Sequence, residues 1–153
     1  MSVEARLTEL GLTLPTPAAP VASYVAAVEA CGMLYISGQL PFADGAVMTG
    51  KLGDMHTIED GQAAAKACAL MLMAQMKQAL GSLDRVERIV KLGVFVASTA
   101  DFTDQPKVAN GASDVMEAVF GDAGKHARAA VSVPSLPLDA MVEIDAVVMV
   151  RGS

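Results

Sequence analysis

One arginine and one glutamate stand out because each interrupts a strongly apolar segment near the end of this 153-residue chain. Arg128 lies in segment 126–133 and Glu143 in segment 142–151, and both segments have the pattern of β-strands. A guanidinium grips a planar carboxylate through two parallel hydrogen bonds, and a carboxylate on a neighbouring strand could position or activate a water molecule. The pair predicts a site for a small carboxylate. A structural ion pair between Arg128 and an acidic residue across a subunit contact is the equally open alternative.

The first third of the chain predicts an N-terminal extension and a hairpin. Residues 1–20 combine a short helix over 3–11 with a proline-rich connector. Two strands, 24–28 and 33–37, follow and are joined through a Cys-Gly turn. A glycine-containing loop then leads to the first long helix.

Two long helices are predicted to position the strands. The first starts at Thr57, where Thr57 and Asp60 have the spacing of a capping box, and it ends at Gly81. The second runs over 106–120, with a proline in its first turn. The β-branched segment 88–97 between them predicts a buried strand.

This order of elements predicts one α+β domain over residues 1–153, with two helices covering one face of a sheet. In the last strand, Val147 and Met149 share the other face with Glu143 and Asp145. Such a mixed face suits a subunit interface with a polar site at its border. The mean hydropathy of +0.44 is high for a small monomer and also indicates association.

Composition argues against several functional classes. The net charge of -6 and scattered basic residues disfavour nucleic-acid binding. Cys31 and Cys68 lack the spacing of zinc ligands, and Cys68 fits a core position in a helix. No apolar run is long enough to span a membrane, and the N-terminus does not resemble a signal peptide. We therefore expect a cytoplasmic protein with no metal, no cofactor, no nucleic-acid partner and no membrane contact.

An ordered set of motifs resembles the Rid family of reactive intermediate deaminases, also labelled L-PSP endoribonucleases. The resemblance runs from about residue 20 to 150. The motifs are Leu34-Tyr35-Ile36-Ser37-Gly38-Gln39, Val94-Phe95-Val96, Asp101-Phe102, Phe120, Ala127-Arg128, Leu136-Pro137 and Val142-Glu143-Ile144-Asp145-Ala146.

The resemblance implies a homotrimer of chorismate-mutase-like fold. Each subunit would contain one mainly antiparallel sheet of about six strands with two long helices on one face, and the sites would lie in clefts between subunits. The family's best-known activity hydrolyses small 2-imino and 2-enamino acids to 2-oxo acids and ammonia, without metal or organic cofactor. The expected ligand is a small metabolite that bears a carboxylate.

Site roles follow from the same resemblance. Arg128 would hold the substrate carboxylate, Glu143 would position the attacking water, and Tyr24, Ser37 and Asn110 would line the cleft. Taken without the family, Tyr24 fits half-buried strand packing and Ser37 a hydroxyl beside a turn.

One departure limits the functional prediction. Ala130 stands where archetypal members carry Cys or Ser two residues after the arginine, so one polar group is missing. The chain therefore resembles a divergent branch of the family. A non-catalytic trimer that binds small carboxylates or regulates a partner is the alternative, and an endoribonuclease is less favoured because a histidine acid–base pair is lacking.

Overall fold

A five-stranded mixed sheet forms the centre of the protein, which is described here by a computed structural model covering residues 1–20 and 22–152. Val21 and Ser153, which the predicted domain 1–153 includes, lie outside the described residues. The strand order is β1-β2-β7-β5-β6, and every neighbouring pair is antiparallel except β5 and β6, which are parallel. The strands are β1 (Ala27–Ala30), β2 (Met33–Gln39), β5 (Val86–Ala97), β6 (Ala127–Val133) and β7 (Val142–Val150).

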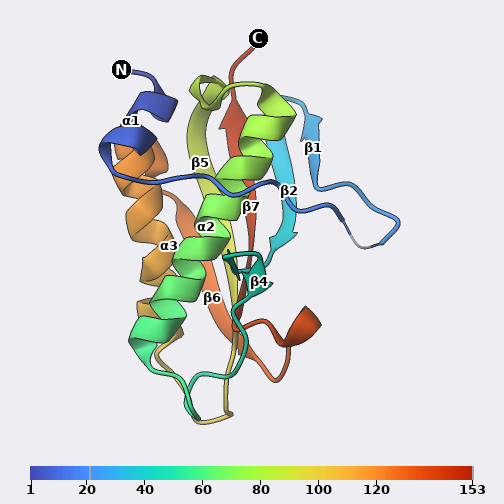
Figure 1. Cartoon of the computed structure of the whole chain (residues 1–153). Helices are drawn as coiled ribbons and strands as arrows, with labels where there is room; N and C mark the ends of the chain where they lie inside the picture. Colours follow the sequence, from blue (N-terminus) through green and yellow to red (C-terminus); the bar gives the residue numbers. More distant parts are fainter. Residues whose placement is uncertain (21, 153) are drawn as a thin grey trace.

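Two long helices cover one face of this sheet (Figure 1). Helix α2 (Ile58–Leu80) packs on β2 and β7, and α3 (Gln105–Phe120) packs on β5 and β6. The short helix α1 (Val3–Glu9) contacts α3, and the connector after it crosses over α2. The described residues also form three single-turn 3-10 helices: η1 (Leu83–Arg85), η2 (Gly121–Gly124) and η3 (Pro137–Asp139).

Local capping interactions explain where the long helices begin and end. The Thr57 hydroxyl accepts from the Asp60 amide at 3.2 Å, and the Asp60 carboxylate accepts from the Thr57 amide at 3.1 Å. These reciprocal bonds satisfy amides that the first turn leaves unpaired. Gly81 ends α2 with φ 82°, a left-handed conformation that favours glycine. The predicted capping box and glycine cap are confirmed.

The two long helices approach each other closely at Gly111. A Cβ atom at this position would collide with backbone atoms of Gln62 in α2. Only glycine allows this distance between the helices, which fixes α3 above β6. Cys68 of α2 is fully buried and burial raises its pKa well above the usual range, so it is a core residue, as predicted.

Several sequence predictions of strand number and order are wrong. The main sheet has five strands rather than about six. It is mainly antiparallel, as predicted, with one parallel pair. Strands β3 (Phe42–Ala43) and β4 (Ala46–Val47) pair only with each other, around an Asp-Gly turn with positive φ. The first strand begins at Ala27 rather than residue 24, because Ser37 bonds the carbonyls of Val25 and Ala26 outside the ladder.

The face of the sheet away from the helices is open in the protomer. Four apolar side chains on it are 40% to 50% exposed: Val28, Tyr35, Val131 and Met149. The exposed side chains lie on β1, β2, β6 and β7, so the apolar surface extends across the sheet. Among the described residues, no helix combines the length and the apolar character that crossing a membrane requires.

Candidate functional site

Arg128 points from the edge strand β6 to the face covered by α3. It is paired in register with Leu92 of β5, which is fully buried beneath the helices. Its Nη1 donates to Asn110 Oδ1 at 2.9 Å and to Ser113 Oγ at 3.0 Å, and both acceptors lie in α3. Its Nη2 donates to the Pro106 carbonyl at 3.3 Å, in the first turn of the same helix. We call Arg128, Asn110, Ser113 and His126 the arginine half-site.

The charge of Arg128 is not neutralised within the protomer. All three acceptors of its guanidinium are neutral groups. Among the described residues, no Asp or Glu forms a salt bridge with it. A half-buried cation fixed by neutral acceptors keeps its attraction for an anion. The guanidinium can therefore receive a carboxylate from a ligand or from another chain.

The structure also brings His126 into this half-site. Ser113 Oγ lies 2.8 Å from His126 Nε2, and His126 Nδ1 lies 2.6 Å from the Gly124 carbonyl oxygen. The sequence left His126 open between a surface, a loop and a site-rim position, and it gave Ser113 no site role. Only its position three residues after Asn110, one helical turn along the same face, could have indicated Ser113.

Ala130 and Ser132, which follow Arg128 on the same face of β6, make contacts inside the protomer and leave no room for a ligand. Ala130 packs against the hydrophobic core. The Ser132 hydroxyl bonds Gln105 Nε2 at 2.7 Å and Ser98 Oγ at 2.6 Å. Space for a ligand therefore lies around the guanidinium itself rather than farther along the strand.

Glu143 lies on the middle strand β7, and its side chain projects onto the open face. It packs directly over Gly38 of β2, where a Cβ would collide with the Glu143 carboxylate. A register shift between Ile36 and Gln39 marks a bulge at this glycine. Burial, followed by the nearby charge of Asp145, raises the pKa of Glu143. A carboxylate with a raised pKa is a stronger base once it is ionised.

Two further predicted residues lie in β2 and just before β1. Ser37 precedes Gly38, and its hydroxyl donates to the Val25 carbonyl at 2.9 Å. Tyr24 precedes Val25 in the chain and its side chain is 50% exposed. We call Glu143 of β7, Ser37 of β2 and Tyr24, which precedes β1 in the chain, the glutamate half-site.

The two half-sites are separate within one protomer. The expectation that Glu143 lies on a strand neighbouring Arg128 is wrong, because β5 is inserted between β6 and β7. Glu143 is level with Val131, three residues along β6 from Arg128. Two strand spacings and three residues each correspond to roughly 10 Å. The two side chains also project from opposite faces, so one small ligand cannot touch both.

Asn110 is the predicted cleft residue that the structure joins to Arg128, through the 2.9 Å bond from Nη1. Ser37 precedes Gly38, over which Glu143 packs, and its hydroxyl donates to the carbonyl of Val25, the residue after Tyr24. A hollow of about 400 Å³ on the open face is lined in part by Ser37, Gly38 and Asp145.

Substitution of Glu143 by glutamine is expected to raise the thermal midpoint at about pH 8, because it removes a carboxylate that burial disfavours. The folded state raises the pKa of Glu143 above its ordinary value of 4.5, so the charge destabilises the fold fully above the raised pKa. Below the ordinary value both states are protonated and the penalty disappears. Melting curves of both proteins should therefore converge at about pH 4.

Glu87→Gln is the matched control, because Glu87 is an exposed glutamate of β5. It should change the midpoint little at either pH. A Glu143→Gln protein that is less stable than wild type at about pH 8 would contradict the desolvation of this carboxylate.

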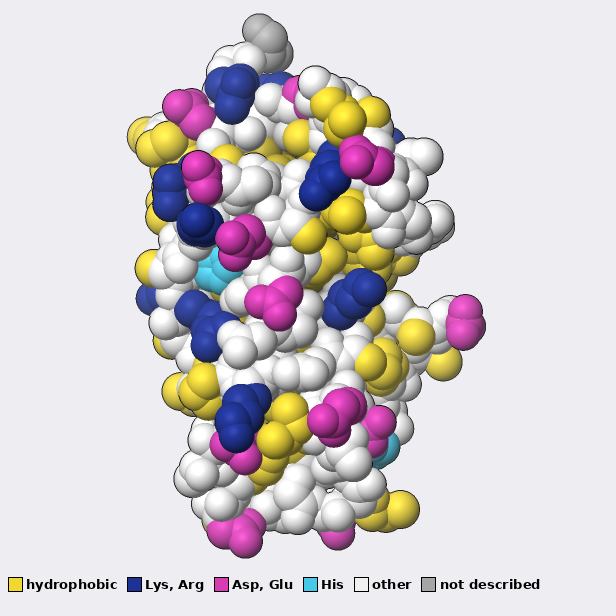
Figure 2. All heavy atoms as spheres, turned by 90° about the vertical axis from the view of Figure 1, so that its left-hand side faces the viewer, with side chains coloured by type: hydrophobic (Ala, Val, Ile, Leu, Met, Phe, Trp, Pro, Cys, Tyr) yellow, Lys and Arg dark blue, Asp and Glu magenta, His cyan; other side chains and the backbone are white. Residues whose placement is uncertain are grey.

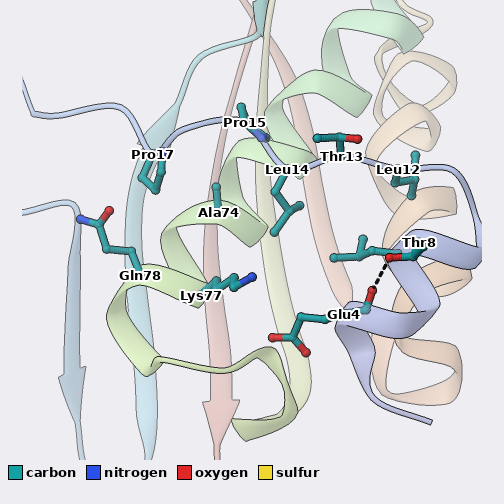
Figure 3. Close-up of a pocket in the computed structure, with 11 residues that line it drawn as sticks. Glu4, Thr8, Leu12, Thr13, Leu14, Pro15, Pro17, Ala74, Lys77 and Gln78 are labelled. Atoms are coloured by element: carbon teal, nitrogen blue, oxygen red, sulfur yellow. Dashed lines mark hydrogen bonds between the residues drawn. The ribbon is translucent and has the colours of Figure 1, made fainter.

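Other surfaces of the protein contain none of the predicted site residues. A hollow of about 580 Å³ lies where Leu14 and Pro15 of the connector pass over Ala74 and Lys77 of α2 (Figure 3). Figure 2 shows the side of α1 and α3, on which basic and acidic side chains are interspersed rather than forming one basic track. Within the described part of the chain, no cluster of three or more His, Cys, Asp or Glu side chains could hold a metal ion.

Comparison with known proteins agrees with this fold. Residues 4–148 match the family model described as "YjgF/chorismate_mutase-like, putative endoribonuclease". Protein TCP17 of Trypanosoma cruzi is 55% identical over 95% of this chain and 92% of its own length.

Two solved structures show how the chain relates to different members. The crystal structure of "a putative endoribonuclease" from Shewanella oneidensis MR-1 has a TM-score of 0.95 and 32% identity, covering 98% of this chain and 100% of that one. RidA from the Antarctic bacterium Psychrobacter sp. PAMC 21119 has a TM-score of 0.62 and 28% identity, covering 88% and 94%. The difference in TM-score agrees with a branch that diverges from RidA. On the matched model and these relatives, the chain belongs to the YjgF, or Rid, family.

Proposed function

We propose that the protein hydrolyses small 2-imino or 2-enamino acids to 2-oxo acids and ammonia, without a cofactor, in a site formed between subunits. The observation that carries the proposal is the guanidinium of Arg128, which neutral acceptors hold in place while its charge has no carboxylate partner in the described protomer. A planar carboxylate is the anion whose shape fits this fork.

The proposed site requires two copies of the chain. The arginine half-site lies at the β6 edge of the sheet, and Tyr24 and Ser37 lie near the opposite edge, formed by β1 and β2. An interface that joins two different edges is heterologous, and repeated heterologous contacts form a ring when the rotation between copies closes. The exposed apolar side chains of the open face support burial of that face in the ring. We propose that the ring is the homotrimer implied by the family.

The reaction needs only modest assistance from side chains. Arg128 would hold the carboxylate, which fixes the C=N carbon relative to Glu143 of the adjacent copy. Glu143 would accept a proton from water as the oxygen adds to that carbon. Glu143 would pass this proton to the nitrogen, which gives the carbinolamine. Glu143 would then accept the hydroxyl proton of the carbinolamine and pass it to the nitrogen, so that ammonia leaves and the 2-oxo acid remains. The raised pKa of Glu143 suits this relay of protons.

Ala130 favours one alternative, a trimer that binds small carboxylates without turning them over. It places a methyl group in the core where a polar side chain could have assisted the reaction. Binding of pyruvate without acceleration of imine hydrolysis would identify that function instead.

Purified wild-type protein is expected to accelerate the decay of 2-iminopropanoate generated in situ, and Arg128→Ala should lose about a hundredfold of kcat/KM. The loss corresponds to two charge-assisted hydrogen bonds of about 1.5 kcal/mol each. Stopped-flow absorbance of the imine, with pyruvate as the measured product, provides the test.

Arg88→Ala is the matched control, because Arg88 is an exposed arginine of the sheet whose Nη2 donates to the Lys125 carbonyl at 2.7 Å. It should retain wild-type rates. Equal decay with and without wild-type protein would refute hydrolysis of this substrate.

A further inference from the structure

A chain of polar contacts connects the guanidinium of Arg128 to the backbone carbonyl of Gly124. Arg128 Nη1 donates to Ser113 Oγ at 3.0 Å, Ser113 Oγ lies 2.8 Å from His126 Nε2, and His126 Nδ1 lies 2.6 Å from the Gly124 oxygen. The contacts join β6, α3 and η2, three elements that meet at the sheet edge.

The chemistry of each group sets the direction of every bond in this chain. The Gly124 carbonyl can only accept, so Nδ1 of His126 carries the hydrogen. In the neutral ring Nε2 is then an acceptor, and the Ser113 hydroxyl donates to it. The remaining lone pairs of Ser113 Oγ face Arg128. His126 thereby turns the serine hydroxyl into an oriented acceptor for the guanidinium.

The hydrogens of the guanidinium can be counted on the same basis. Nη1 has two, and Asn110 and Ser113 take both. Nη2 has two, of which the Pro106 oxygen takes one, and Nε has one more. The Nε hydrogen and one Nη2 hydrogen have no acceptor among the described residues. These nitrogens form one edge of the planar fork, and two parallel bonds to a carboxylate require such an edge.

We propose that Ser113, oriented by His126, is a positioning residue that fixes Arg128 so that the substrate carboxylate binds to its Nε–Nη2 edge. The inference rests on the proposed function for the identity of the ligand as a carboxylate. Binding through Nη1 and Nη2 instead would displace Asn110 or Ser113 from Nη1, and the guanidinium would lose an acceptor that holds it in place.

Nuclear magnetic resonance of the arginine side chains tests the geometry with pyruvate as the probe. In the free wild-type protein, rotation about the Cζ–Nη1 bond of Arg128 should be slow, because two acceptors hold Nη1. Pyruvate should shift the Nε–H proton of Arg128 downfield. The resonance is assigned by its loss in Arg128→Lys. A shift at Nη1 with none at Nε would overturn the edge assignment.

Variants of the serine and histidine test the positioning role. Ser113→Ala should accelerate the Nη1 rotation, weaken pyruvate binding about tenfold and raise KM by a similar factor, with a smaller effect on kcat. Ser113→Thr keeps the hydroxyl and should restore binding. His126→Phe should weaken binding less than Ser113→Ala, and the double variant should match Ser113→Ala alone, because the histidine acts through the serine.

Ser132→Ala is the matched control, since this serine lies on the same face of β6 but bonds Gln105 and Ser98 instead. It should leave pyruvate affinity unchanged. Unchanged affinity and rotation in a folded Ser113→Ala protein, or additive effects in the double variant, would overturn the positioning role. Slow rotation in wild type without any response to pyruvate would instead overturn the carboxylate assignment, and the proposed function with it.

Discussion

Co-expression of Arg128→Ala and Glu143→Gln chains is expected to restore about one quarter of wild-type imine hydrolysis, although each variant alone loses most of its activity. The reason is the separation of the two half-sites. Within one protomer the side chains leave opposite faces of the sheet, and β5 separates their strands. A working site must therefore take Arg128 from one copy and Glu143 from the next.

The expected fraction follows from random assembly in a ring. A site is intact when the copy that supplies arginine carries Glu143→Gln and the copy that supplies glutamate carries Arg128→Ala. With equal amounts of both chains, each condition holds in about half of the cases, so about one site in four is intact. The measurement is the rate per site in the unfractionated mixture. Assemblies purified through two different affinity tags contain no homotrimers, so about one site in three should be intact in them.

Co-expression of Arg128→Ala with Arg128→Gln is the matched control. No arrangement of these two chains contains an arginine half-site, so activity should stay at the level of either variant. Verified mixed assemblies of Arg128→Ala and Glu143→Gln that remain inactive would refute a site shared in this way. A return of activity would establish the shared site.

Gly111→Ala is expected to lower the free energy of unfolding by about 2 kcal/mol, within the range for overpacking. Helix propensity alone predicts the opposite, because alanine stabilises a helix interior by about 1 kcal/mol relative to glycine. The added Cβ collides with backbone atoms of Gln62, which cannot rotate away as a side chain can. Urea unfolding at a fixed protein concentration provides the test, since association also contributes to stability.

The same substitution should reduce imine hydrolysis in the protein that remains folded. Gly111 lies between Asn110 and Ser113 in α3, and both of these contact Arg128. Moving α3 away from α2 displaces the acceptors of the guanidinium.

Gly61→Ala provides the comparison at the other glycine of the helix pair. Its Cβ would lie 2.9 Å from a methyl group of Val108, and a side chain of this kind can adjust. The loss of stability should be small, because the gain in helix propensity offsets it. If Gly111→Ala is as stable as Gly61→Ala, the close backbone contact does not fix the position of α3.

The ends of the long helices could be predicted from the sequence, because they depend on residues close together in the chain. The capping box at Thr57, the glycine cap at Gly81 and the helix that begins near Pro106 all appear where the pattern placed them. Each of these signals acts within one or two turns of helix, so the local sequence contains the information. The alternation of β7 likewise gave the correct faces for Glu143 and Asp145.

Strand neighbours could not be predicted in the same way. β6 and β7 are consecutive in the chain, yet each pairs with β5 rather than with the other. The pairing depends on which strands bury the most apolar surface beneath α2 and α3, and that choice involves contacts far apart in sequence. The predicted adjacency of Arg128 and Glu143 failed for this reason.

The two long helices and the family could be read from the amino-acid sequence, because both depend on local patterns and on ordered motifs. The separation of Arg128 and Glu143 into two half-sites appears only in the folded chain. The contacts from Arg128 to Ser113 and from Ser113 to His126 likewise form only when α3 packs on β6. Which side chains bond a charged group depends on their distance from it and their direction in space. The spacing of residues along the chain gives neither the distance nor the direction.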